Sequence, residues 1–308
     1  MRADIHIKNI HKVSKEHSNI NGLDIEINRG DIIGLIGPDG SGKTSLLHLL
    51  ATIQFPDSGD ILLDGKSIYS NIEEYKQRVG YMPRNNPLYE NMRVIEFIEL
   101  MANISNIPKY LRPTRIIDIL RECNLEIDKN SLIGKLSRGT KRRLGIAQAI
   151  INRPDILLLD HPTSGLDPNQ ANKIKKLIKE LSKSCTIIIT TNTLDEIIHL
   201  CSRIIYLNSG SIIGDINCNE LAELESGNEI YKVKLSPVTL ERALTELELL
   251  PNIERAEIIS DNIYLHCKKG KNIEEDIFNI CLEHGWYIKN LSKIELSIEE
   301  ILTHVLNK

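Results

Sequence analysis

Several features that mark whole classes of protein are missing from this 308-residue sequence. No apolar run approaches the roughly 18–20 residues that a membrane span needs, and the first residues hold no hydrophobic core of a secretion signal. The 38 basic residues are outnumbered by 42 acidic ones, whereas a nucleic-acid-binding surface is strongly basic. We therefore expect a cytoplasmic protein that binds no nucleic acid and reaches a membrane only through a membrane partner.

The six cysteines lack the C-x-x-C spacing of a metal cluster or redox site. They are scattered singly along the chain: Cys123, Cys185, Cys201, Cys218, Cys267 and Cys281. This is typical of buried thiols in a reducing cytosol, and it indicates neither a disulfide framework nor an iron–sulfur site.

The hydrophobic pattern predicts an α/β domain over residues 1–215. Three segments are almost wholly apolar, as buried parallel strands are: 31–36, 156–159 and 186–189. Helical patterns lie between them, at 94–124 and 171–184. The first of these has five expected apolar anchors: Leu100, Ile104, Leu111, Ile116 and Ile117. Strands that alternate with helices predict a parallel sheet built from βαβ units.

A second, smaller domain is expected after a polar linker at 216–229. Over residues 230–308 the pattern reads strand, helix, strand, strand, helix, strand, which is the order of a ferredoxin-like α+β unit. A last helix is expected over 297–306, where the sequence opens with a capping-box-like pattern. This unit carries no chemistry that the sequence identifies, and dimer contact or regulation is its expected role.

The segment 37–44 fits the phosphate-binding pattern G-x-x-x-x-G-K-[ST], follows a predicted strand and opens a helical run. Its residues, with the one that follows, are Gly37, Pro38, Asp39, Gly40, Ser41, Gly42, Lys43, Thr44 and Ser45. Glycines let backbone N–H groups turn inward as an anion-binding nest, and the helix N-terminus adds partial positive charge. Lys43 would reach the β- and γ-phosphates. The alternative, a glycine-rich turn with a chance lysine, does not account for the strand–loop–helix setting.

The apolar strand at 156–159 ends in Asp160. A carboxylate at this edge of a parallel sheet is where a nucleotide-bound Mg²⁺ sits in P-loop proteins. Alone this signal is weak, because many buried strands end in aspartate. Together with the P-loop it predicts a nucleoside triphosphate and Mg²⁺ as ligands, with Thr44 and Asp160 at the metal.

With two further motifs, the sequence resembles the ATP-binding subunit of an ABC transporter. Its signature-like segment consists of Leu136, Ser137, Arg138, Gly139 and Thr140, and its D-loop-like segment of Ser164, Gly165, Leu166 and Asp167. The motifs cover 37–167, and the resemblance extends to about residue 215. It implies an α/β P-loop fold of ABC type, with a mixed-sheet core, an antiparallel β subdomain and a helical insert at about 85–150.

Segments 81–89 and 165–170, together with the C-terminal unit, are similar to the ABC-2 exporter branch and its gliding-motility-associated ATPases. This resemblance implies the energy-coupling subunit of an exporter, bound to the inner face of the cell membrane. The implied partners are transmembrane permease subunits on separate chains and a second ATP-binding subunit, identical to this chain or not. In the family, the signature serine, here Ser137, contacts the ATP held by the other subunit.

Four positions depart from the family pattern. His161 stands where the family has its glutamate general base, Asn192 where it has a switch histidine, and Arg84 where it has the Q-loop glutamine. The aromatic residue that stacks on adenine aligns near Ser14, and residues 1–50 contain no Phe, Tyr or Trp. Because a positioned general base contributes about 10²–10⁴-fold, we expect this chain's own hydrolytic site to be impaired.

Two other functions remain compatible with these motifs. One is a nucleotide-binding regulatory module that does not hydrolyse ATP, and the other is a soluble ABC-type ATPase of translation or DNA repair. The single ABC unit and the net charge of −4 disfavour the latter. The basic residues in and after the signature, which are Arg138, Lys141, Arg142 and Arg143, are interpreted as a solvated helix face.

Overall fold

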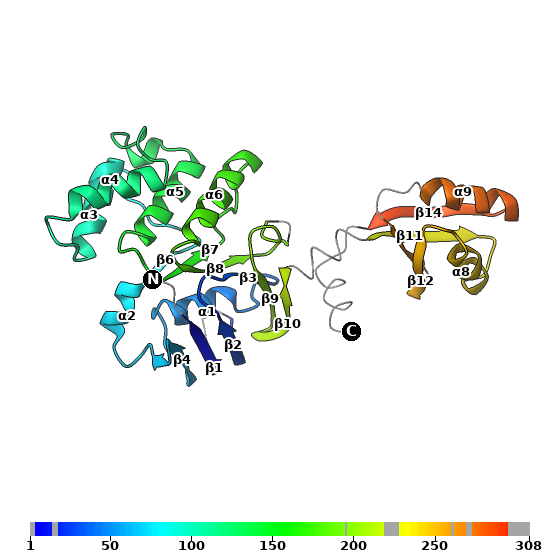
Figure 1. Ribbon diagram of the computed structural model, residues 1–308, viewed down its shortest axis with the longest axis horizontal. Coiled ribbons are helices and arrows are strands. Elements are labelled where there is room, and N and C mark those ends of the chain that lie inside the picture. Colours follow the sequence, from blue (N-terminus) through cyan, green and yellow to red (C-terminus); the bar gives the residue numbers. More distant parts are fainter. Residues whose placement is uncertain are drawn as a thin grey trace. The chain divides into compact units, whose positions relative to one another are not determined.

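A computed structural model of the chain describes residues 4–13, 18–194, 196–218, 228–259, 262–268 and 273–294. The chain divides into two compact units, 1–218 and 219–308, which are described separately below (Figure 1). None of the helices in the described ranges is long and apolar enough to cross a membrane. The expected helix at 297–306 lies outside the described residues.

The first unit is built on a six-stranded sheet. Its strands, in spatial order, are β10 (Ser211–Asn217), β9 (Arg203–Asn208), β3 (Ile32–Ile36), β8 (Thr186–Thr191), β7 (Ile156–Asp160) and β6 (Val79–Met82). The five strands from β9 to β6 are parallel, and β10 pairs antiparallel with β9. The predicted buried strands are confirmed, since β3, β7 and β8 are buried throughout. The antiparallel β10 makes the sheet mixed.

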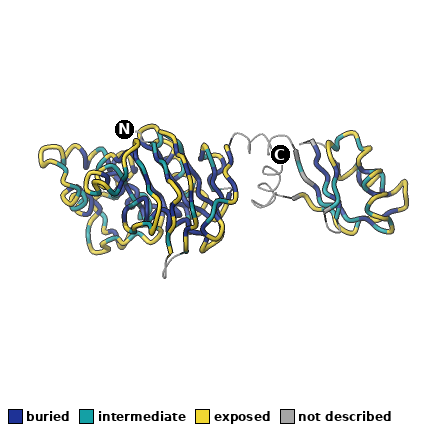
Figure 2. The backbone as a smooth tube through the Cα atoms, turned by 90° about the horizontal axis from the view of Figure 1, so that it is seen from below, coloured by how far each residue is buried: buried dark blue, intermediate teal, exposed yellow. Residues whose placement is uncertain are grey.

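A second, antiparallel sheet covers the other side of the first unit's core. Its strands, in spatial order, are β2 (Ile20–Ile27), β1 (Ile5–Lys12), β4 (Ser58–Leu63) and β5 (Lys66–Ser67). Isoleucines and leucines from both sheets and from helix α1 (Lys43–Leu50) form one continuous core. In Figure 2 the buried residues run along the strands. The fold therefore holds the start of α1 rigidly beside the carboxyl ends of the parallel strands.

The first unit has a helical insert between β6 and β7, as predicted. The insert contains α3 (Val94–Ile104), α4 (Arg112–Glu122), the 3₁₀ turn η1 (Ile133–Lys135) and α5 (Arg138–Ala149). Helix α2 (Ile72–Arg78) precedes β6, and α6 (Pro168–Leu181) follows β7. Figure 1 shows α3, α4 and α5 grouped together, and α5 contacts β6. The contact involves the middle and the end of α5, since Gly145 lies against Met82 and Gly80 lies against Ala149.

The prediction of one helical stretch with its anchors over 94–124 was partly wrong. The stretch is two helices, because Asn106 takes a left-handed φ of 56° and Pro113 lies in the first turn of α4. Of the expected anchors, Ile104, Leu111 and Ile117 are exposed, while Ile116 is buried. The core positions are instead Phe97, Ile98, Ala102, Ile119 and Leu120. The break resets the 3.6-residue phase, so one period could not fit both helices.

The second unit confirms the predicted strand and helix order. Its elements along the chain are β11 (Asn228–Ser236), α8 (Leu240–Glu248), β12 (Ile253–Ile259), β13 (Asn262–Lys268), α9 (Ile273–His284) and β14 (Tyr287–Ile294). The spatial order β12-β13-β11-β14 is antiparallel throughout. Both helices contribute side chains to the same core as the strands. Strands β10 and β11 each extend two residues into the 216–229 segment that the pattern assigned to a linker.

The cysteines behave as the sequence predicted. All six are buried and none forms a disulfide. Burial raises the pKa of several of these thiols, to about 12 for Cys123 and Cys267. They remain protonated and unreactive at neutral pH, because the thiolate is the reactive form.

Candidate functional site

The loop between β3 and α1 takes its shape from glycine. Gly37 has φ 153°, and a Cβ there would lie 2.0 Å from the carbonyl oxygen of Leu207. Gly42 caps α1 with φ 105°, in a region that L side chains rarely adopt, and no side chain bonds to the first-turn amides. The loop therefore curls around the N-terminus of α1, where backbone amides and the helix dipole favour an anion.

Lys43 lies inside this curl, with only 4% of its side chain surface exposed. Its Nζ donates to the carbonyl oxygens of Gly37 at 2.7 Å and Pro38 at 2.9 Å, and to Ser41 Oγ at 3.3 Å. Burial lowers the pKa of Lys43. These hydrogen bonds hold the ammonium group beside the backbone amides of the anion-binding nest.

Asp160 ends β7 beside the start of α1. Its Oδ2 accepts from Thr44 Oγ1 at 3.1 Å, and its Oδ1 accepts from Thr190 Oγ1 at 2.5 Å. The carboxylate is 1% exposed, so these two hydroxyls orient it. A hydroxyl and a carboxylate side by side are hard oxygen ligands of the kind Mg²⁺ prefers, and this donor set fits the predicted metal position.

His161 follows directly, in a left-handed conformation with φ 49°. Its backbone N–H donates to Thr190 Oγ1 at 3.0 Å. The side chain is buried, and burial lowers the pKa of His161, against the opposing attraction of Asp160. The imidazole is therefore held neutral at physiological pH.

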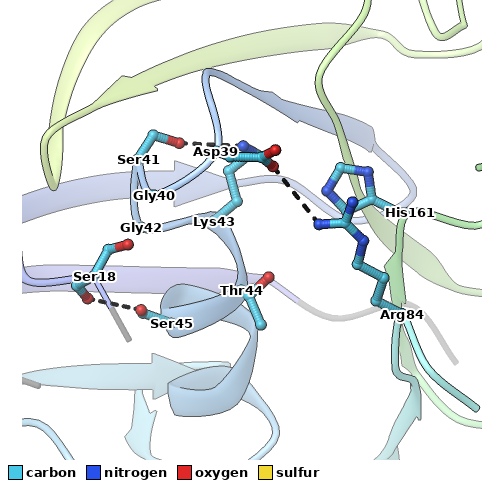
Figure 3. Close-up of a pocket in the computed structure, with 10 residues that line it drawn as sticks. All are labelled: Ser18, Asp39, Gly40, Ser41, Gly42, Lys43, Thr44, Ser45, Arg84 and His161. Carbon is cyan, nitrogen blue, oxygen red and sulfur yellow. Dashed lines mark hydrogen bonds and ion pairs between the residues drawn. The ribbon is translucent and has the colours of Figure 1, made fainter. Parts of the chain in front are cut away.

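Arg84 and Asn192 converge on the loop residue Asp39. Asn192 Nδ2 donates to Asp39 Oδ1 at 3.0 Å, and Arg84 Nη1 lies 3.6 Å from the same oxygen. Figure 3 shows the Arg84 side chain reaching toward the loop, where a dashed line marks its ion pair with Asp39. The hydrogen bond from Asn192 and the nearby charge of Arg84 hold the pKa of Asp39 below its usual value. All three replaced positions thus lie at one site.

A cavity of 390 Å³ lies between the P-loop, Arg84 and His161. Its lining is polar and contains Ser18, residues 39–45, Arg84 and His161. Glycine amides, a buried lysine, and the Thr44–Asp160 pair are the donor set for a phosphate chain with Mg²⁺. The residues present therefore fit a nucleoside phosphate.

Arg138 of the signature-like segment and Ser164, Gly165 and Leu166 of the D-loop-like segment line a second groove. Ser137 caps α5 by accepting from the N–H of Thr140 at 3.1 Å, and Gly139 lies against the Gln170 side chain. A groove of 650 Å³ contains residues 84–88, Glu90, Arg138, Lys141, Arg142 and residues 164–166. Within the described residues, the chain does not bring its own signature to its P-loop cavity. Asp167 caps α6 instead, accepting from the N–H of Gln170 at 3.0 Å.

The basic residues after the signature are not the solvated face that the sequence suggested. Arg142 Nη1 donates to the carbonyl oxygen of Arg84 at 2.7 Å, and Lys141 pairs with Glu90 at 3.0 Å. Arg143 donates to Thr140 Oγ1 at 3.1 Å. These three side chains are half-buried and only Arg138 is exposed. The prediction failed because long cationic side chains bury their stems and reach carbonyl groups.

Two residues of the site were missed from sequence. Thr190 holds both Asp160 and His161, and Ser18 lines the cavity and accepts from Ser45 Oγ at 2.7 Å through its carbonyl oxygen. Thr190 was missed because threonine, like the isoleucines beside it, is a β-branched residue that is common in strands without any functional role. The sequence does show that Thr190 follows a predicted buried strand, as Asp160 does, but it does not show that these two strands are neighbours. Ser14 lies outside the described residues.

Comparison with known sequences points to one family. Residues 20–164 match the family described as ABC transporter. The Nod factor export ATP-binding protein I of Cupriavidus metallidurans is 31% identical over 273 residues, covering 87% of this chain and 88% of that protein. The protein of the same name from Burkholderia pseudomallei is 32% identical over 266 residues and covers 86% of each chain.

Solved structures agree. The cbiO1 protein of Clostridium perfringens, part of the ABC transporter complex cbiONQ, is 25% identical, with a TM-score of 0.65 over 80% of this chain and 95% of that chain. A dimeric ATP-binding cassette in a post-hydrolysis state, bound to ADP and Pi, is also 25% identical, with a TM-score of 0.61 over 70% of this chain and 98% of that one.

Proposed function

Because this chain belongs to the ABC transporter family as an ATP-binding subunit, we propose that it binds Mg²⁺-ATP in its P-loop cavity and couples binding to export. The observation that carries the proposal is that Lys43 and Thr44 line one polar cavity and that the buried Asp160 is hydrogen-bonded to Thr44. The loop amides and Lys43 would hold the phosphates, and Thr44 and Asp160 would hold Mg²⁺. The metal, when bound, would neutralise phosphate charge.

A second ATP-binding subunit, identical to this chain or not, would complete the site. Ser137 is exposed at the N-terminus of α5, where this helix end can meet a nucleotide held by another subunit. The dimeric cassette among the similar structures, bound to ADP and Pi, supports this arrangement. Transmembrane permease chains would use the closing motion, and the names of the Nod factor export relatives support export as the direction. The subunit would then act at the inner face of the cell membrane.

The chain's own site would hydrolyse ATP slowly or not at all. His161 offers a neutral imidazole where a carboxylate base is expected, and Asn192 cannot carry a proton in the manner of histidine. Arg84 adds a permanent cation beside the metal position. These three side chains differ together from the hydrolytic set, while Ser137 and Gly139 are retained for the partner's site.

A gain-of-function variant tests this proposal. In the purified full chain, His161→Glu supplies a carboxylate base, and we expect steady-state ATP turnover to rise by about 10²–10⁴-fold. His161→Gln is the matched control, since it has the size of glutamate without the basic carboxylate, and it should leave turnover unchanged.

The proposal of an impaired site is wrong if the unaltered chain turns over at about 1–10² s⁻¹ and His161→Ala abolishes that activity. Co-purification with a multi-span membrane protein tests the transport role. A chain that binds ATP but never associates with such a protein would instead be a regulatory nucleotide-binding module.

A further inference from the structure

Arg84 is the cation at the site whose side chain is free to change partners. Lys43 is already engaged by two loop carbonyls and Ser41 Oγ. Among the described residues, the Arg84 guanidinium makes no hydrogen bond, and its ion pair with Asp39 spans 3.6 Å. Both side chains are substantially exposed, at 49% for Arg84 and 74% for Asp39. Such a pair is weak and easily exchanged.

The backbone of Arg84 is, by contrast, fixed. Its carbonyl oxygen accepts from Arg142 Nη1 of α5 at 2.7 Å. The base of the Arg84 side chain is therefore held while its end can swing across the cavity. Figure 3 shows that this end already points toward the P-loop.

We propose that Arg84 distinguishes nucleoside triphosphates from diphosphates by leaving Asp39 and binding the terminal phosphate. This inference rests on the proposed nucleotide binding, and it goes further by assigning selectivity to one side chain. A guanidinium can bind two phosphate oxygens at once, and such charge-assisted bonds are stronger than an exposed ion pair. A diphosphate lacks the group that Arg84 would reach, so Arg84 would remain with Asp39.

Asp39 acts as the resting partner in this exchange. Asn192 Nδ2 holds Asp39 Oδ1 at 3.0 Å, so the carboxylate stays in place when Arg84 leaves. Each triphosphate must displace the Arg84–Asp39 pair before it gains the new contact. Removal of the Asp39 charge therefore frees Arg84 in advance and favours the triphosphate.

Equilibrium binding of ATP and ADP to the full chain tests the proposal. In Arg84→Gln, we expect ATP affinity to fall about tenfold, equivalent to about 1.4 kcal/mol, with ADP affinity within twofold of the unaltered chain. Retained ADP binding shows that the variant is folded. Arg121→Gln removes an exposed arginine of α4 that lies outside the cavity lining, and it should change neither affinity. Asp39→Asn should raise ATP affinity relative to ADP, and Arg84→Gln should cancel that gain in the double variant.

The proposal is overturned if Arg84→Gln weakens ATP and ADP equally, or changes neither. Equal weakening would mean that Arg84 serves the shared phosphates or the general field of the cavity. If neither nucleotide binds the unaltered chain, the proposed function itself fails, which is a separate and recognisable result.

Discussion

Replacement of Thr190 by valine should loosen the Asp160 carboxylate without changing the volume of the core. Thr190 is 0% exposed, and its hydroxyl both donates to Asp160 Oδ1 and accepts from the backbone N–H of His161. A hydrogen bond to a charged group contributes about 1.5–3 kcal/mol, and a buried N–H left unpaired costs about 1–3 kcal/mol. The apolar gain of the added methyl offsets part of this, leaving a loss of about 3 kcal/mol.

Two probes separate this effect from general unfolding. Hydrogen exchange of the β7 and β8 amides follows the first unit. The chain's single tryptophan, Trp286, is buried in the second unit, so its fluorescence follows that unit alone. We expect Thr190→Val to reduce protection in β7 and β8 and to leave the Trp286 unfolding transition unchanged.

A functional readout accompanies the stability measurement. Thr190→Val should weaken nucleotide binding in the presence of Mg²⁺ more than in its absence, because Asp160 is the expected metal ligand. Ile189→Val is the matched control on the same strand, buried to 1% exposure and expected to cost about 1 kcal/mol. The reasoning is refuted if Thr190→Val changes protection by less than Ile189→Val, or if both variants weaken Mg²⁺-dependent binding equally.

Two further outcomes follow from the geometry. Gly37→Ala should destabilise the first unit by more than about 3 kcal/mol, because the new Cβ would lie 2.0 Å from Leu207 O. The control Gly65→Ala should cost about 1–2 kcal/mol, since Gly65 has φ 80° but a Cβ there meets nothing within 4 Å. Equal losses of the free energy of unfolding in denaturant would contradict this prediction. Burial lowers the pKa of His161 from 6.5, so the folded state resists protonation of this side chain. The free energy of unfolding should therefore be highest above pH 6.5 and should fall as the pH drops from 6.5 toward the lowered pKa of the folded state. The slope should be at most about 1.4 kcal/mol per pH unit. His161→Asn should flatten that slope, and an unchanged slope would show that another group causes it.

The parts of the fold that a local pattern determines could be predicted from sequence. The apolar runs of β3, β7 and β8 leave few alternatives to buried strands, and the P-loop pattern places its own lysine and glycines. The residues that pack into the core could not be predicted where the chain changes direction. Ile104 and Ile117 look like anchors in one continuous helix, yet they are exposed once the chain breaks near Asn106.

Most of the residues of the site were predicted from the sequence, but the hydrogen bonds between them were not. The sequence identifies His161, Arg84 and Asn192 as unusual, and they do lie beside one another near Asp39. No spacing rule reveals that Thr190 holds Asp160, because that contact depends on how β7 and β8 pair in the sheet. Side-chain partners across a sheet follow from register, which a single sequence does not state.

Titration of the full chain with Mg²⁺-ATP in a calorimeter shows whether the P-loop cavity binds nucleotide. We predict saturable binding at one site per chain, lost in Lys43→Ala and retained in Lys141→Ala, whose cation pairs with Glu90 outside the cavity lining. Heat no greater than that of dilution at millimolar nucleotide, in a chain shown to be folded, would contradict it.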